Sequence, residues 1–469
     1  MDACVRYTPA AMKIALIGCC SGAFIMPLLS TMMNLALPAL DAEFDVGSKS
    51  LAFVVISFLI ASVLTIVPVA RLSDIYGRKK IFVIGVVTTI ISGVIATFSP
   101  SYEILLAMRV MMGAGSAAIT VSSIALLTEV YPFARRGWAI GMQSTFVYLG
   151  IALGPTLGGI ICQFFGWRYL FAFMMPFAVI SLIYMLKFKE EPVLDTNRRM
   201  DYRGSLVYGV SILLTMYGVV NLPNIWAICM VAAGLVILVF FVTMMKKTEQ
   251  PILDVRVFKY KVFTRACIAA FMNYGASYSV AFFLALYLQH MGELTPLRAG
   301  LLLFIQPAIQ AALSAKTGSY SDRIKDKRIL PTAGMSIIAM GVFMIIFLQR
   351  EPNFYYIGVI LVLLGIGYAL FAAPNTNAVM SSVPPKNRGE ASGMISFVRQ
   401  VGMLTSMGVA TCTIAIIMGS KDSLFDPTTW EQFMQVIQIA FTICFGMCIV
   451  GIITSWFRGK DQRDSNECP

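Results

Sequence analysis

The chain contains a series of apolar runs, each about 20 residues long, which is the length that an α-helix needs to cross the hydrocarbon core of a bilayer. Of its 469 residues, 58% are hydrophobic and 13% are charged, whereas soluble domains have about 25% charged residues. The runs predict an all-α integral membrane protein with fourteen transmembrane helices. The expected spans are 12–37, 50–70, 80–99, 103–128, 138–162, 168–188, 204–222, 225–245, 262–288, 297–317, 330–349, 354–378, 391–418 and 433–457.

The basic residues predict the orientation of these spans. The net charge of +12 does not indicate nucleic-acid binding, because the lysines and arginines lie in short segments between apolar runs. With both ends of the chain in the cytoplasm, 28 Lys and Arg residues fall on the inner side and five on the outer side. Basic residues are enriched in cytoplasmic loops. We therefore expect a multi-pass protein with both termini in the cytoplasm.

An internal repeat divides the chain. The pattern P-x-x-x-R-G-x-A-x-G-M occurs at Pro132–Met142 and again at Pro384–Met394. Repeated halves are a common architecture of secondary transporters. The repeat predicts two six-helix bundles separated by an inserted helix pair. The expected parts are an N-terminal bundle over 12–188, two inserted transmembrane helices within 204–245, and a C-terminal bundle over 262–457.

The inner segment 71–80, between the second and third spans, combines an acid, a glycine turn and a basic cluster. A carboxylate there can lie at a helix N-terminus or pair with an arginine of a neighbouring helix. We expect a latch that holds one conformation shut; the alternative is that the basic residues only set topology. The latch candidates from both halves are Asp74, Gly77, Arg78, Asp322, Arg136 and Arg388.

Arg109 is a charged residue within the fourth predicted span. A charge at membrane depth costs roughly 2.5–3.5 kcal/mol on insertion scales. This cost favours a role in substrate contact or proton relay. The alternative is an arginine that reaches the interface or binds backbone carbonyls.

The fifth predicted span carries glycines four residues apart and an internal proline. Such glycines allow close helix contact, and the proline frees a backbone carbonyl and creates a bend point. We expect a hinge, the alternative being close packing alone. Its residues are Gly150, Gly154, Pro155, Gly158 and Gly159.

Several of these patterns resemble a known family. The sequence D-x-x-G-R-K-K from Asp74 resembles the signature of the major facilitator superfamily, with Ala70 in place of its leading glycine. Arg109 resembles the arginine of that family's fourth span, and G-x-x-x-G-P-x-x-G-G in the fifth span resembles the motif of its antiporter branches. With further stretches such as Gly166-Trp167-Arg168, the chain is most similar to the fourteen-span drug:proton antiporter branch, of the multidrug efflux type. The resemblance implies the major facilitator fold and alternating access.

The sequence departs from that branch at Leu29, where the branch usually has an aspartate. No Asp or Glu lies in the middle of any predicted span. We therefore expect a substrate path lined by neutral polar, aromatic and cationic groups, which prefers neutral, zwitterionic or anionic amphipaths to quaternary ammonium compounds. The candidates are Asn34, Arg109, Gln143, Asn273, Tyr274, Tyr278, Gln306, Gln310, Asn377, Arg399 and Gln400.

Together these features predict a secondary active transporter of the plasma membrane that exports amphipathic small molecules, driven by an ion or proton gradient. Uptake or exchange of a metabolite by the same fold is the alternative, and a membrane sensor without transport is a third. The sequence has no phosphate-binding loop, so we do not expect ATP to drive transport. It has one histidine, His290, and no C-x-x-C pair, so we expect no metal site. We expect a transporter without a cofactor and not an enzyme. The expected partners are a small-molecule substrate and the lipid bilayer, with no nucleic acid, and the monomer is expected to function.

Overall fold

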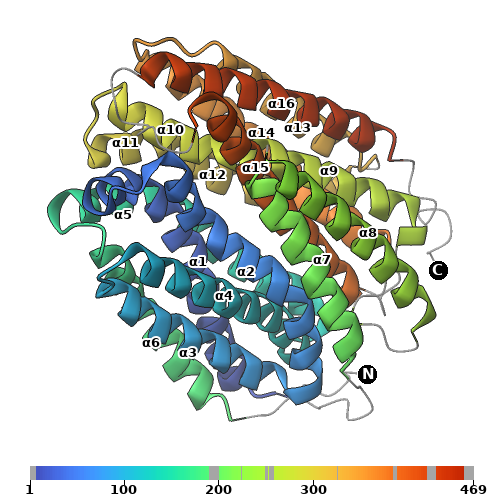
Figure 1. Cartoon of the computed structure of the whole chain (residues 1–469). Coiled ribbons are helices and arrows are strands. Elements are labelled where there is room, and N and C mark those ends of the chain that lie inside the picture. Colours follow the sequence, from blue (N-terminus) through green and yellow to red (C-terminus); the bar gives the residue numbers. More distant parts are fainter. Residues whose placement is uncertain are drawn as a thin grey trace. The chain divides into compact units, whose positions relative to one another are not determined.

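The computed structural model describes residues 7–189, 200–222, 224–248, 252, 258–324, 326–383, 388–419 and 429–458. Every regular element in these ranges is a helix (Figure 1). The helices are α1 (Pro9–Phe44), α2 (Gly47–Tyr76), α3 (Arg78–Thr97), α4 (Tyr102–Val130), α5 (Phe133–Phe164), α6 (Tyr169–Lys187), α7 (Tyr202–Val220), α8 (Ile225–Lys247), α9 (Lys261–Ser277), α10 (Ser279–His290), α11 (Pro296–Leu303), α12 (Ile305–Arg323), α13 (Ile329–Ile346), α14 (Phe354–Ser381), α15 (Arg388–Ile417) and α16 (Trp430–Trp456).

Thirteen helical segments of the described ranges are long and apolar enough to cross a membrane. The predicted count of fourteen is therefore not confirmed. The difference is α7, which is helical over Tyr202–Val220 but is not among the thirteen. Its first turns hold Arg203 and Ser205, and these polar residues lower the hydropathy of a helix that is only 19 residues long.

Two predicted spans each contain a break. The span predicted at 262–288 is formed by α9 and α10, which meet at Tyr278, and the span predicted at 297–317 contains α11 and most of α12, which meet at Phe304. The backbone N–H of Tyr278 still donates to the carbonyl of Tyr274 at 3.2 Å, so the chain continues in helical direction through the first break. Each pair forms one segment that is long and apolar enough to cross a membrane, Lys261–His290 and Pro296–Ser314.

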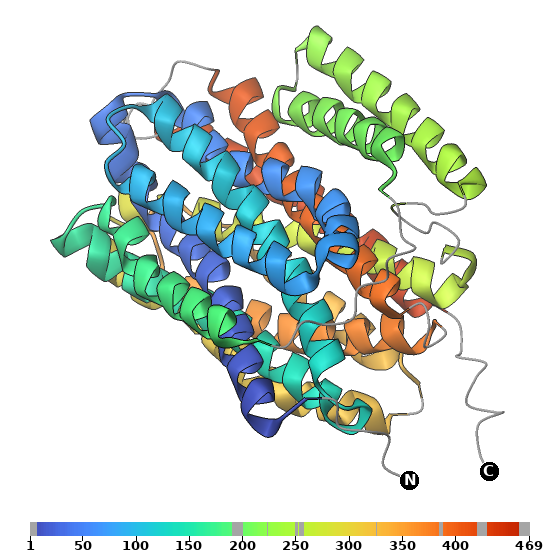
Figure 2. The same cartoon turned by 90° about the horizontal axis from the view of Figure 1, so that it is seen from below.

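The described chain forms two compact units, and the first contains Met1–Tyr217, Cys229–Ile252 and Glu293–Phe304. In this unit α1 packs against α4, α5 and α6, and α4 packs against α2 and α3. α7 and α8 lie side by side (Figure 2), where the rings of Tyr208 and Phe241 are 5.7 Å apart. The Tyr208 hydroxyl donates to the carbonyl of Val63 at 2.6 Å, which fixes α7 to α2.

The second unit contains Gly218–Ile228, Leu253–Gly292 and Ile305–Pro469. α9 packs against α15 and α16, and α14 packs against α12 and α13. A buried apolar cluster joins α9, α14 and α15, and it includes Phe263, Val379 and Met394. The division into bundles at 12–188, 204–245 and 262–457 stays a prediction.

Candidate functional site

Arg78 connects three helices at the predicted latch. α2 ends at Tyr76, and Gly77 adopts φ 105°, a conformation that glycine takes without strain, so that α3 begins at Arg78. The Arg78 guanidinium donates to Glu129 Oε2 at 2.8 Å and to the Ala125 carbonyl at 2.9 Å. Its other terminal nitrogen lies 3.6 Å from Asp74 Oδ1. The first residue of α3 is thus bound to the last turns of both α2 and α4.

The latch has two features that the sequence did not predict. Glu129 was not among the candidates, although an acid at the end of the apolar fourth span was a signal for it. Buried hydroxyls of Ser73 and Ser122, 3.1 Å apart, form a second link between α2 and α4. The side chains of the remaining latch candidates, Asp322, Arg136 and Arg388, lie outside what the structure describes, so the second copy of the latch stays a prediction.

Arg109 is almost completely buried, with 1% of its surface exposed. Its Nε donates to the carbonyl of Val54 at 2.9 Å, and its guanidinium lies 4.9 Å from the ring centroid of Phe58. Both partners belong to α2, so Arg109 fixes α4 to α2. The hydrogen bond to the Val54 carbonyl agrees with the alternative in which Arg109 binds backbone carbonyls. A role of Arg109 in substrate contact stays a proposal.

The glycines of α5 form a close contact with α1. A Cβ added to Gly158 would lie 2.8 Å from Met32 Cα, and one added to Gly150 would lie 2.8 Å from the carbonyl of Phe24. At Gly154, a Cβ would collide with the side chain of Thr31. Only glycine permits these approaches, as the spacing of four residues predicted.

The same helix also packs against α11, which belongs to the same unit. A Cβ at Gly159 would overlap the carbonyl of Pro296, and a Cβ at Gly300 would overlap the carbonyl of Pro155. α5 therefore has one glycine face toward α1 and a second toward α11. Gly300 is a contact residue that the sequence analysis did not single out. Whether α5 acts as a hinge stays a prediction.

The substrate-path candidates divide between the two units. In the first unit, Gln143 is 5% exposed and donates to Ser123 Oγ at 2.6 Å, while Asn34 is half-buried. Gln143 Oε1 and Asn34 Oδ1 are buried and have no hydrogen-bond partner among the described residues. Buried polar atoms are usually hydrogen-bonded. These two acceptors are therefore available to a ligand that donates a hydrogen bond, as far as the described side chains show.

In the second unit, Asn273 is fully buried on α9. Its Nδ2 contacts Met335 Sδ at 3.3 Å, and within the described chain its Oδ1 has no hydrogen-bond partner. The guanidinium of Arg399 lies 5.9 Å from the ring centroid of Tyr274, which brings two candidates together. Gln310 is buried. The half-buried candidates of this unit are Tyr274, Tyr278, Gln306, Asn377, Arg399 and Gln400.

Leu29 is fully buried on α1. The acids of this helix are Asp41 and Glu43, and both lie near its C-terminal end. In α1 of this chain, the position at which the fourteen-span drug:proton antiporter branch usually has an aspartate is therefore apolar, as the sequence indicated.

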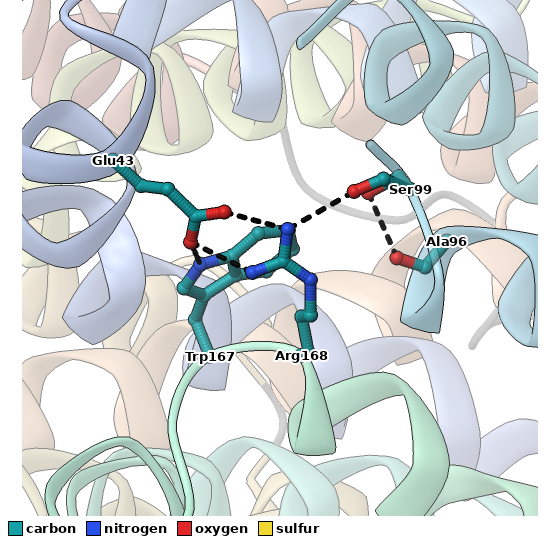
Figure 3. Close-up of polar contacts among 5 residues, drawn as sticks. All are labelled: Glu43, Ala96, Ser99, Trp167 and Arg168. Atoms are coloured by element: carbon teal, nitrogen blue, oxygen red, sulfur yellow. Dashed lines mark hydrogen bonds and ion pairs between the residues drawn. The ribbon is translucent and has the colours of Figure 1, made fainter. Parts of the chain in front are cut away.

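Glu43 belongs to a polar cluster at the ends of α1, α3 and α6 (Figure 3). Its two carboxylate oxygens accept from Arg168 at 2.6 and 2.7 Å, and Oε2 also accepts from the Trp167 indole at 2.7 Å. Arg168 donates in addition to the carbonyl of Ser99 at 3.1 Å, and its guanidinium lies 4.3 Å from the Trp167 ring centroid. This cluster fixes α1 to α3 and α6 and contains no substrate-path candidate.

Comparison with known proteins identifies the family of this protein. The model of the Major Facilitator Superfamily matches residues 19–407 and 266–467, and the chain belongs to this family. Members of this family are secondary transporters of the membrane rather than enzymes.

The names of three relatives point to different substrates. The chain is 30% identical to the multidrug resistance protein Stp of Mycobacterium tuberculosis, over 84% of this chain and 74% of the relative. It is 25% identical to the riboflavin transporter RibZ of Clostridioides difficile, over 96% and 98% of the two chains. It is also 25% identical to the lincomycin resistance protein LmrB of Listeria monocytogenes, over 93% and 94%.

Solved structures share the fold at low sequence identity. A bacterial homologue of the human lysosomal transporter Spinster, inward-facing and occupied, matches with a TM-score of 0.69 at 15% identity, covering 99% of this chain and 100% of that chain. The human organic anion transporter MFSD10 matches with a TM-score of 0.64 at 15% identity, covering 96% and 100%. These likenesses establish the major facilitator fold.

Proposed function

We propose that the protein exports amphipathic small molecules across the plasma membrane by alternating access, driven by a proton or ion gradient. This proposal rests mainly on Gly150, Gly154 and Gly158 of α5. They belong to the motif that resembles that of the antiporter branches, and they lie directly against α1. Two relatives of resistance type, Stp and LmrB, support export. We also propose that the protein is an antiporter, that both of its termini lie in the cytoplasm, and that it functions as a monomer.

The charges of the described helices favour a particular class of substrate. Leu29 leaves the middle of α1 without a carboxylate, while Arg109 and Arg399 place two cations within α4 and α15. A permanently cationic substrate in a low-dielectric path needs an anionic partner, because an unpaired buried charge is costly. We therefore propose neutral, zwitterionic or anionic amphipaths as substrates. Asn34, Gln143 and Asn273 supply buried polar atoms that can bind them.

Transport by purified protein in liposomes tests this function. We expect an imposed proton gradient to drive accumulation of a neutral or zwitterionic amphipathic drug, and collapse of the gradient with an ionophore to abolish it. Riboflavin is the second substrate in the assay, because the similarity to the riboflavin transporter RibZ extends over nearly the whole chain. Gradient-independent exchange of riboflavin, without drug accumulation, would favour the metabolite alternative. Absence of transport for either compound, in a folded protein, would contradict export of this substrate class.

A further inference from the structure

Two consecutive residues at the C-terminal end of α16 contact arginines from separate parts of the second unit, and the next residue is itself an arginine. Arg328, which precedes α13, places its guanidinium 5.7 Å from the ring centroid of Trp456. Arg265, in α9, donates to the carbonyl of Phe457. The residue that follows Phe457 is Arg458. α16 packs against both α9 and α13, so the three cations converge on one end of one helix.

Arg458 is the buried member of this group, with 1% of its surface exposed. One terminal nitrogen donates to Asn375 Oδ1 and lies 3.4 Å from Ser455 Oγ. Its Nε and its other terminal nitrogen are buried and have no hydrogen-bond partner in the described part of the chain. Burial lowers the pKa of the guanidinium to about 10, so it still carries its charge at neutral pH.

Among the residues that the structure describes, the balance of charge at this end of α16 is positive. In the contacts described here, one carboxylate faces the three arginines: Asp326 accepts from Arg328 at 2.7 and 2.8 Å. No carboxylate of the described ranges contacts Arg458. A charge inside a low-dielectric interior is screened less than one at the surface. The two half-buried arginines can supply N–H donors at the surface, and Arg458 adds positive charge behind them.

The neighbouring surface is apolar and aromatic. Trp456 is 52% exposed and Phe457 is 63% exposed, and Ile453 lies exposed one turn earlier on α16. Tryptophan is enriched where the hydrocarbon core meets the headgroups. An apolar face next to a cluster of arginines fits a molecule that has acyl chains and a negatively charged headgroup.

We propose that the end of α16 binds an anionic phospholipid, with the phosphate held by Arg265 and Arg328 over the buried charge of Arg458 and the acyl chains beside Trp456 and Phe457. Binding of one lipid there joins α9, α13 and α16 at the headgroup level. The proposal requires only that the protein is a membrane protein and does not depend on what it transports.

The test measures thermal unfolding of the purified full-length protein in detergent with added phosphatidylglycerol or phosphatidylcholine, and counts bound lipids by native mass spectrometry. We expect phosphatidylglycerol to raise the unfolding midpoint more than phosphatidylcholine does. The double variant Arg265→Gln, Arg328→Gln should lose at least half of that difference and one bound lipid. Arg458→Gln changes a buried group and can prevent folding. The double variant of Arg265 and Arg328 therefore decides the test.

The chain provides a matched control at the other end of the same helix. Arg350 is exposed and its guanidinium lies 5.4 Å from the ring centroid of Trp430, the first residue of α16. Arg350→Gln should leave the phosphatidylglycerol effect unchanged. Full retention of the effect in the double variant would overturn the proposal, as would equal loss in Arg350→Gln. An equal rise with inorganic phosphate alone would show a free-anion site instead of a lipid site.

Discussion

Arg78 and Glu129 lie 2.8 Å apart and join the first residue of α3 to the last turn of α4. Their side chains are 29% and 19% exposed, so the pair itself contributes only about 0–1 kcal/mol to stability. Its position is more informative than its strength. The same guanidinium also contacts the Ala125 carbonyl and Asp74, so one side chain fixes the relative positions of three helix ends.

Replacing Arg78 with alanine should slow transport much more than it weakens binding. The variant loses the contacts to Glu129 and Asp74. A coupling of about 1–3 kcal/mol corresponds to a factor of roughly 5 to 150, and we expect the transport rate to fall by an amount in this range. Initial rates in liposomes and substrate binding in detergent measure the two effects separately. Lys80→Ala, an exposed basic residue of the same helix, is the control. A native transport rate for Arg78→Ala would mean that the basic segment serves topology alone.

Gly158→Ala should destabilise the protein by about 1–3 kcal/mol, because the added methyl group meets the backbone of Met32. The thermal unfolding midpoint in detergent measures the loss. Gly141 lies on the same helix, and a Cβ added there would have no described atom within 4 Å outside the adjacent backbone. Gly141→Ala should therefore be neutral or slightly stabilising. Equal midpoints for the two variants would contradict a close contact between α5 and α1.

Arg109→Gln should remove a preference for anionic substrates. A hydrogen bond to a charged group contributes about 1.5–3 kcal/mol, which corresponds to a loss of roughly tenfold or more for an anion and little change for a neutral analogue. Transport of an anionic dye and of a quaternary ammonium dye of similar size measures the preference. Arg109→Lys, which keeps the charge, is the comparison. A clear preference for the quaternary dye that persists in Arg109→Gln would refute the proposed substrate class.

Glu43 and Arg168 should show a coupling energy of about 1 kcal/mol in a double-mutant cycle. The bidentate geometry favours a measurable value, and the partial exposure of both side chains predicts that added salt reduces it. The variants are Glu43→Gln, Arg168→Gln and their combination, compared by free energy of unfolding in urea. Strictly additive single effects would show that the bond of Figure 3 adds no stability.

Cysteine labelling should place Asn353 outside the cell and Lys247 inside it. Both residues are exposed at helix ends, and the distribution of basic residues predicts opposite sides for them. In a background without other cysteines, Asn353→Cys should react with an impermeant reagent in intact cells, and Lys247→Cys should react only after the membrane is opened. The reverse pattern would invert the proposed topology.

Much of the fold could be predicted because its elements follow from the length of apolar runs. α3 at Arg78–Thr97 and α6 at Tyr169–Lys187 begin and end within two residues of the predicted spans. The break at Phe304 had a signal in the sequence, because Pro307 lacks the N–H that would donate to the carbonyl of Leu303. The break at Tyr278 could not be predicted, because no proline lies near it. Hydropathy reports membrane depth, whereas a local change of helix direction depends on packing.

The polar sites were only partly predictable. Asp74 and Arg78 were identified by their spacing, but Glu129 became visible only when α4 was placed beside α3. Arg458 was counted among the basic residues that set topology, and no sequence pattern distinguishes it from a solvated arginine. Its burial follows from how α16 ends against α9 and α14, which is a property of tertiary packing.

The apolar position of Leu29 has a consequence for the electrical side of transport. A carrier that binds a proton on a membrane carboxylate moves that charge in each cycle, and this chain has no acid in the middle of α1. In the proposed exchange, the charge moved per turnover is the sum of the charge of the substrate and that of the coupled ion. A membrane voltage contributes about 2.3 kcal/mol per elementary charge and 100 mV. An interior-negative voltage therefore favours the exit of an anion, and export of anions should be electrogenic and sensitive to depolarisation.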